Sequence, residues 1–73
     1  MAVTQRMMKI QLNGKAHELS AVMPLSDFLA SIGLGGKPVV VELNEAPVFA
    51  RDYPVTQIED GSRVEIVVLA AGG

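Results

Sequence analysis

The chain has 73 residues and a formal net charge of −2, contains no cysteine, and is 49% hydrophobic. This length allows one small domain with a single core, and the apolar content is that of a folded globule. The six Lys and Arg residues are scattered, which argues against a nucleic-acid-binding stripe, and the absence of thiols excludes disulfides and thiolate catalysis. With His17 as the only histidine, no metal site is expected.

The first residues, MAVTQR, look separate from the rest of the chain. MMKIQLNG would itself make a sensible start, so residues 1–6 are predicted to be a loose extension ahead of a domain at residues 7–69. The start lacks the apolar region of a secretory signal, and no apolar run approaches the roughly 18 residues of a membrane helix. The cytoplasm is therefore the expected location.

A β-hairpin pattern opens the predicted domain. Apolar and polar residues alternate in MKIQL, residues 8–12, which predicts a half-buried strand. Asn13-Gly14 follows, and both residue types tolerate the positive φ angles of a type I′ turn. The return strand is predicted over residues 16–20.

An amphipathic helix is predicted next, in PLSDFLASIG. Its apolar stripe has the i, i+3, i+4, i+7 spacing of one helix face and consists of Leu25, Phe28, Leu29 and Ile32. Pro24 suits the first turn, Asp27 suits the positive end of the helix dipole, and Gly33 suits the left-handed position after the last turn.

Three further strands complete the pattern. The β-branched run VVVEL, residues 39–43, predicts a strand in the centre of the sheet, and PVFA, residues 47–50, predicts a short edge strand because it starts with proline. The pair Asn44-Glu45 is predicted to form the turn between them. Residues 51–61 are predicted to be irregular, and a final strand is predicted over residues 62–70.

This order of elements predicts an α+β fold of the β-grasp, or ubiquitin-like, type. In that arrangement a mixed sheet of four to five strands buries its apolar face against a single helix. The domain would occupy residues 7–69, and residues 70–73 would form a flexible tail.

No residue pattern indicates catalysis or cofactor binding by the chain itself. GLGG at residues 33–36 lacks the lysine and hydroxyl of a phosphate loop and is better explained as a helix end followed by a loop. His17 and Ser26 have no partner in the sequence that would activate them. Glu59-Asp60 are explained by the turn that they precede.

The terminal Gly-Gly is the candidate reactive element. It follows a strand directly, and the last four residues can extend roughly 13 Å from the domain. Because glycine has no Cβ, Gly72 and Gly73 can enter a narrow channel. The carboxylate of Gly73 is therefore predicted to be the working group, inserted into the active site of another protein, with Gly72 as its flexible neighbour.

The final strand is predicted to present apolar residues beside this tail. The residues predicted to face the helix are Val64, Ile66 and Val68. Val67 and Leu69 would then point to solvent, where they could form a docking surface. The candidate partner-binding residues are Val67, Leu69, Ala70 and Ala71. Scattered exposed apolar residues are also normal, and the pattern alone leaves both interpretations open.

Four stretches resemble the small ubiquitin-like sulfur carriers of bacteria, and most closely the ThiS family of thiazole (thiamine) biosynthesis. They are KIQLNGK, PLSDFLASIGL, VELN and EDGSRVEIVVLAAGG, and together they extend the likeness over residues 8–73. DGSRVEIV leading into the terminal Gly-Gly is the most specific part. Three places depart from the family pattern: Asn44-Glu45 for Asn-Gly, Arg51-Asp52-Tyr53 for an Arg-Ser-x-Trp-like stretch, and AAGG for a triple glycine.

The resemblance implies a protein co-substrate and not an enzyme. An E1-like adenylating enzyme would use Mg-ATP to convert Gly73 to an acyl-adenylate, and a persulfide-borne sulfur would displace AMP to leave a thiocarboxylate. Thiazole synthase would then take the sulfur. No cofactor would bind to the chain itself. A free monomer is expected, because the tail must reach two partners in turn.

Other functions are also compatible with this sequence, and most of them use the same activated terminal glycine. A carrier for molybdopterin synthesis is the first alternative, although such carriers tend to be longer and often end in a sequence like FPPVAGG. A carrier for cysteine synthesis is the next. A ubiquitin-like modifier joined to lysines would also use an adenylated glycine, whereas a simple β-grasp interaction module would not use its tail.

Overall fold

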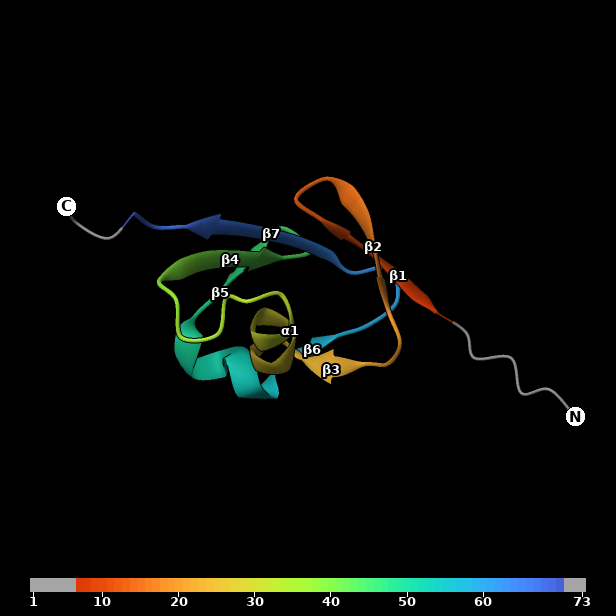
Figure 1. The fold of residues 1–73 in the computed structure, drawn as a ribbon, viewed down its shortest axis with the longest axis horizontal. Coiled ribbons are helices and arrows are strands. Elements are labelled where there is room, and N and C mark those ends of the chain that lie inside the picture. Colours follow the sequence, from red (N-terminus) through yellow and green to blue (C-terminus); the bar gives the residue numbers. More distant parts are fainter. Residues whose placement is uncertain (1–6, 71–73) are drawn as a thin grey trace, which may run out of the picture.

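A mixed five-stranded sheet lies against one α-helix in the computed structural model, which describes residues 7–70 (Figure 1). The elements in chain order are β1 (Met8–Leu12), β2 (Lys15–Leu19), β3 (Met23–Pro24), α1 (Leu25–Ser31), β4 (Val39–Leu43), β5 (Ala46–Val48), the 3-10 helix η1 (Ala50–Val55), β6 (Gln57–Ile58) and β7 (Arg63–Val68). The predicted α+β, β-grasp arrangement is confirmed. The helix in the described part of the chain is too short and not apolar enough to cross a membrane.

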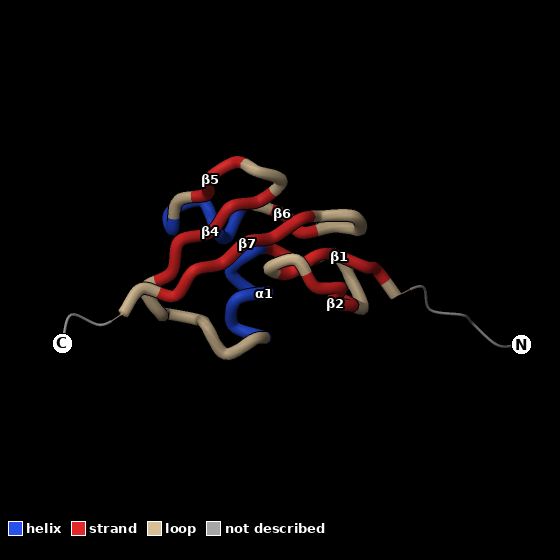
Figure 2. Tube along the Cα trace, turned by 90° about the horizontal axis from the view of Figure 1, so that it is seen from above, coloured by secondary structure: helices blue, strands red, loops and turns tan. Residues whose placement is uncertain are grey.

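The last strand lies in the middle of the sheet. The strand order is β2-β1-β7-β4-β5, and β3 and β6 form a separate two-stranded ladder. β7 is parallel to β1 and antiparallel to β4, while the other neighbours in the five-stranded sheet are antiparallel. Viewed from above, α1 starts beneath β7 and runs across the direction of the strands (Figure 2). The strand that leads to the tail therefore has a neighbour on each side.

The predicted hairpin and its turn type are confirmed. Asn13 and Gly14 have φ angles of 50° and 79°, so both central residues adopt the positive φ of a type I′ turn. A two-residue turn allows pairing to resume at once, with Lys15 opposite Leu12. The return strand consequently begins one residue earlier than predicted.

The predicted helix forms with its apolar stripe in the core. Leu25, Phe28 and Leu29 are buried, while Ile32 is the half-buried residue that ends the helix. Pro24 precedes the first turn and is not part of it, because it has extended backbone angles and pairs with Gln57.

Residues 51–61, predicted to be irregular, contain two short elements. The 3-10 helix η1 surrounds Pro54 and is followed by β6. The hydroxyl of Thr56 donates to the carbonyl of Asp52 over 2.6 Å, which secures the end of η1. Such short pieces have no apolar period that a sequence can display. The predicted edge strand is confirmed as β5, which starts at Ala46.

The core lies between α1 and the inner face of the sheet. Its buried members come from the helix and from the sheet strands and β6; they are Ile10, Leu19, Leu25, Phe28, Leu29, Val41, Ile58, Val64 and Ile66. Ser62 is the buried polar residue within residues 7–70, and its hydroxyl accepts the Glu59 N–H over 3.1 Å. The core therefore contains almost only aliphatic and aromatic surface.

The side chain of Asn13 extends the contact between β1 and β7. Its Oδ1 accepts the N–H of Ile66 over 2.7 Å, and its Nδ2 donates to the carbonyl of Ile66 over 3.1 Å. Asn44 makes a smaller contact of this kind, because its Oδ1 accepts the Arg63 N–H over 2.8 Å. Two asparagines with positive φ thus supply hydrogen bonds to β7 from the turns on either side of it.

Replacing these asparagines tests how much the side-chain bonds stabilise the fold. Asn13→Gly keeps the turn conformation but leaves the N–H and C=O of Ile66 without these partners, at a cost of about 2 kcal/mol. For a domain of this size the melting temperature should fall by about 10 °C. Asn44→Gly is the matched control, because it removes one exposed side-chain hydrogen bond. It should lower the melting temperature by about half as much. Equal losses in the two variants, measured by thermal denaturation, would contradict a special role for Asn13.

Candidate functional site

Backbone hydrogen bonding within the sheet continues up to the start of the C-terminal tail. Beyond the last residue of β7, the N–H of Leu69 still donates to the carbonyl of Pro38 over 2.8 Å. Ala70 is exposed and is the last residue that the structure describes. The tail therefore starts from a backbone that is hydrogen bonded up to Leu69. The predictions for Ala71, Gly72 and Gly73 concern positions outside the described residues and stay predictions.

The end of β7 exposes apolar side chains on both faces. Val67 is 61% exposed and Leu69 is 48% exposed, so their predicted outward orientation is confirmed. Val68 was predicted to face the helix, and this prediction is wrong, because its side chain is 53% exposed. α1 lies across β7, where Val64 and Ile66 are buried, and β7 runs past it (Figure 1).

A residue from the neighbouring strand completes this surface. Val40 is 48% exposed and lies directly opposite Val67 in the β4–β7 ladder. We call this surface the terminal apolar patch; it consists of Val40, Val67 and Leu69, whereas Val68 points to the opposite face of the sheet. The sequence analysis missed Val40 and assigned Val68 to the core. The alternation within VVVEL could have indicated that Val40 points outward, but its pairing with Val67 depends on the sheet register.

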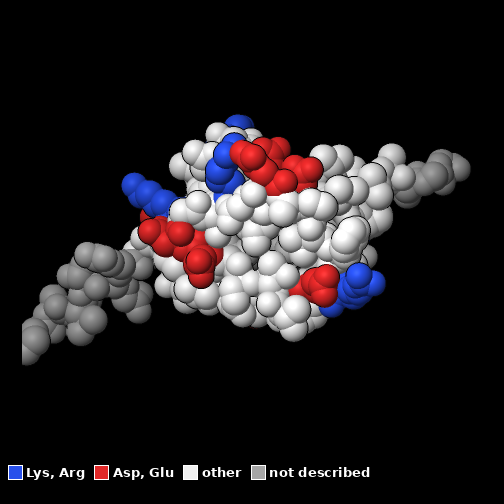
Figure 3. All heavy atoms as spheres, turned by 180° about the vertical axis from the view of Figure 1, so that it is seen from behind, with Lys and Arg blue, Asp and Glu red and all other residues white. Residues whose placement is uncertain are grey.

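Charged side chains do not form a continuous field on the face opposite to that seen in Figure 1. Figure 3 shows Lys and Arg beside Asp and Glu in small groups, with uncharged surface between them. The ion pairs among residues 7–70 are Arg63–Glu45, at 2.9 Å, and Arg51–Asp52, at 3.9 Å. On this face the described residues therefore offer no basic stripe for a phosphate backbone.

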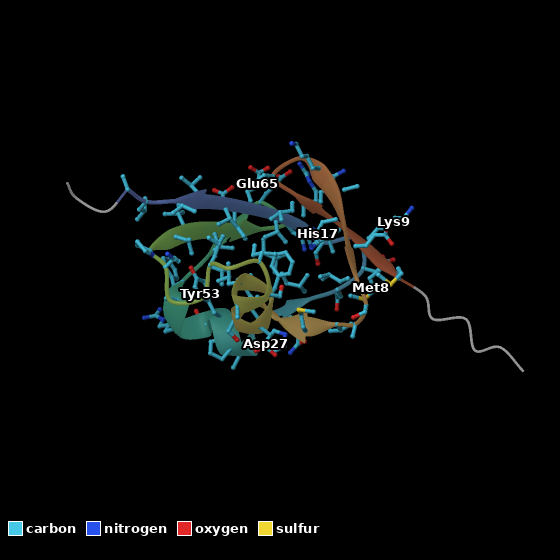
Figure 4. The ribbon with its side chains drawn as sticks, in the orientation of Figure 1. Met8, Lys9, His17, Asp27, Tyr53 and Glu65 are labelled. Carbon is cyan, nitrogen blue, oxygen red and sulfur yellow. The ribbon has the colours of Figure 1, made fainter. Side chains whose placement is uncertain are left out.

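The other residues considered from the sequence have structural roles. His17 points into the space between the sheet and α1 and meets the ring of Phe28 edge-on, with ring centroids 5.5 Å apart (Figure 4). In GLGG, Gly33 has a φ of 81° just after the helix, and a Cβ on Gly35 would lie 3.3 Å from Ala30. Within residues 7–70, His, Asp and Glu do not gather into a group that could hold a metal ion.

Comparison with known proteins identifies the family. The model of the ThiS family matches residues 10–73, which is most of the chain and includes its last residue. The chain belongs to the ThiS family. The resemblance inferred from the sequence is thereby confirmed, and the three local departures from the family pattern do not remove the chain from it.

Solved structures of a ThiS protein have the same fold. A crystal structure of the thiamine biosynthesis protein ThiS from Geobacter metallireducens is 25% identical, with a TM-score of 0.78, over 90% of this chain and all of that chain. A solution structure of a thiamine biosynthesis protein from the same organism gives a TM-score of 0.76 at 25% identity, over 90% of this chain and 88% of that chain. The fold of the described domain is therefore the fold of these solved ThiS structures.

Two curated relatives are much longer proteins. Thiazole synthases from Paramagnetospirillum magneticum and Magnetococcus marinus are each 33% identical to this chain over 66 residues. The match covers 90% of this chain but only 20% of each relative, so the chain spans about a fifth of their length. The similarity therefore concerns one segment of those proteins.

Truncating two valines of β7 tests where the core of this ThiS-family domain ends. Val64→Ala removes two methyl groups from a fully buried site and should destabilise the domain by about 2 kcal/mol. Val68→Ala is the matched control at an exposed site and should change the stability by less than about 0.5 kcal/mol. Denaturant unfolding of both variants measures the difference. A comparable loss for Val68→Ala would mean that the end of β7 is packed against the rest of the domain.

Proposed function

We propose that this ThiS-family chain is a protein co-substrate that carries sulfur as a thiocarboxylate on Gly73 and delivers it for thiazole formation. The observation that carries the proposal is the family match, which extends to Gly73. The position of β7 supports it, because the central strand of the sheet leads directly into the tail. The working group is then the terminal carboxylate, and the folded domain serves to present it.

The carboxylate needs activation before sulfur can be attached, because its negative charge repels nucleophiles. In the proposed sequence, Gly73 attacks the α-phosphorus of Mg-ATP on an E1-like adenylating enzyme, and pyrophosphate leaves. A persulfide sulfur then attacks the acyl carbon and displaces AMP. A thiol cleaves the resulting acyl disulfide, which leaves a thiocarboxylate on Gly73 and a disulfide on the donor. The chain needs no cysteine for any of these steps.

The terminal apolar patch is proposed as the surface that docks on the partner enzymes. It is rich in exposed valine and leucine and lies next to the tail, so a partner that covers it also receives Gly73. Ala70 and Ala71 would continue this contact toward the active site. The partners would be the adenylating enzyme, a persulfide donor and thiazole synthase; the two relatives named thiazole synthase support the last of these.

Carriers for molybdopterin or cysteine synthesis would use the same activated glycine. The ThiS family match and the ThiS solved structure favour the thiazole branch over both of these. A ubiquitin-like modifier would differ in its product, an isopeptide bond to a lysine.

Intact mass measurement tests the carrier function directly. The chain is incubated with an E1-like sulfur-carrier adenylating enzyme, Mg-ATP and a persulfide source. We expect its mass to increase by the difference between one sulfur atom and one oxygen atom, and the change to lie at Gly73. Deletion of Gly73 should abolish the gain and leave the melting temperature unchanged. If an enzyme proven on another carrier produces no mass change, the carrier proposal is wrong. Conjugates to lysine would indicate a modifier.

The double variant Val67→Ser/Leu69→Ser tests the terminal apolar patch. Both side chains are exposed, so folding should be retained, while loss of apolar contact should raise the KM for the carrier at least about tenfold in ATP–pyrophosphate exchange. Val55→Ser, which changes a side chain that is 75% exposed in η1, is the control and should behave like wild type. A normal KM for the double variant would exclude the patch as the docking surface.

A further inference from the structure

Two carboxylates face each other on the outer side of the sheet. Glu42 of β4 and Glu65 of β7 are direct cross-strand partners, and both are exposed. Figure 4 shows Glu65 on the side of β7 that faces away from α1. Side chains at such positions have Cβ atoms roughly 5 Å apart, and like charges there destabilise a sheet. The fold would therefore be more stable without this pair.

Within residues 7–70, no cation forms an ion pair with either of these carboxylates. The ion pairs within residues 7–70 are Arg51–Asp52 and Arg63–Glu45, so neither Glu42 nor Glu65 takes part in one. Arg63 lies two positions before Glu65 on the same strand, but its guanidinium is 2.9 Å from Glu45. The negative charge of the pair is thus available to another molecule.

The carboxylate pair adjoins the terminal apolar patch and lies close to the tail. Val40 and Val67 form a cross-strand pair two residues along the same ladder, so the acidic and apolar pairs share one face. From Ala70, three residues lead to Gly73, a span of at most about 10 Å. A protein that acts on Gly73 must therefore come close to this face.

Charge complementarity limits what can cover this face. A second copy of the chain, docked face to face, would bring two acidic pairs together, and a nucleic acid or an anionic membrane would be repelled. A cation flanked by apolar side chains matches both parts of the face. Arginine fits best, because its planar guanidinium can donate to two carboxylates and its stem can lie on the valines.

We propose that the outer face of β4 and β7 docks on the adenylating enzyme, with an arginine of that enzyme between Glu42 and Glu65 and apolar side chains on Val40 and Val67. This inference rests on the proposed carrier function. It commits to the adenylating enzyme because, in the proposed sequence of steps, Gly73 must be activated before any other partner can use it, so this enzyme is the first to approach the face. In the free protein the two carboxylates repel each other, and in the complex the arginine of the partner would reduce this repulsion.

Charge-removing variants test the inference. Glu42→Gln and Glu65→Gln keep the size of the side chain, and each should raise the melting temperature by up to about 4 °C because the repulsion disappears. Each should also raise the KM for the carrier about tenfold or more in ATP–pyrophosphate exchange, with kcat unchanged. Glu59→Gln, which removes one exposed charge elsewhere, is the control for net charge. Added NaCl should raise the KM of wild type more steeply than that of either variant.

The outcomes separate this inference from the proposed function. If wild type supports exchange and both Gln variants match it, the docking inference is wrong and the carrier function stands. If the variants lose only sulfur transfer to thiazole synthase, the face belongs to that enzyme and the inference is also wrong. Titration calorimetry with the adenylating enzyme covers the case in which wild type gives no ATP–pyrophosphate exchange. If wild type then binds the enzyme and the variants do not, the docking inference is supported and the proposed carrier function is contradicted. Absence of binding by wild type would overturn both.

Discussion

The place of β7 between β1 and β4 is the constraint on which the rest of the structure depends, and the carboxamide of Asn13 strengthens its contact on the side of β1. The ladder between β1 and β7 is short: Gln11 and Leu12 are paired in it, and the Asn13 N–H donates to the carbonyl of Val64 over 2.9 Å where the chain turns into the hairpin. The Asn13 side chain takes the place of the missing length of β1 by offering one donor and one acceptor to Ile66. β7 is consequently held from both sides as far as Ile66, and β4 alone accompanies it beyond that residue.

The same place along β7 separates the core from the surface that partners would use. The short helix α1 covers the strand at Val64 and Ile66, and past it the side chains of both faces reach solvent. Because α1 crosses the direction of β7, it covers only part of that strand, and Val68 lies beyond the covered part (Figures 1 and 2). The domain thus leaves apolar surface uncovered where its backbone is still ordered by the sheet, which agrees with a function based on being bound.

Local chemistry accounts for what the sequence could predict. The Asn13-Gly14 turn, the spacing of the helix stripe and the alternation along the strands each act over a few residues, so the hairpin, the helix and the outward direction of Val67 followed from them. The errors and omissions depend on distant parts of the chain. The exposure of Val68 reflects where α1 crosses β7. The pairing of Val40 with Val67 and of Glu42 with Glu65 reflects the sheet register. The Asn13–Ile66 contact joins residues 53 positions apart and has no local pattern.

The parallel pairing of β1 and β7 has a consequence for how this domain can be attached to other polypeptides. Because the two strands run in the same direction side by side, the start of β1 at Met8 and the end of β7 at Val68 lie at opposite ends of the sheet (Figure 1). An affinity tag or a second domain joined ahead of Met7 would therefore begin on the far side of the molecule from Ala70. The domain can be tethered at one end while the other end stays open to an enzyme, as a module carried within a larger protein would require.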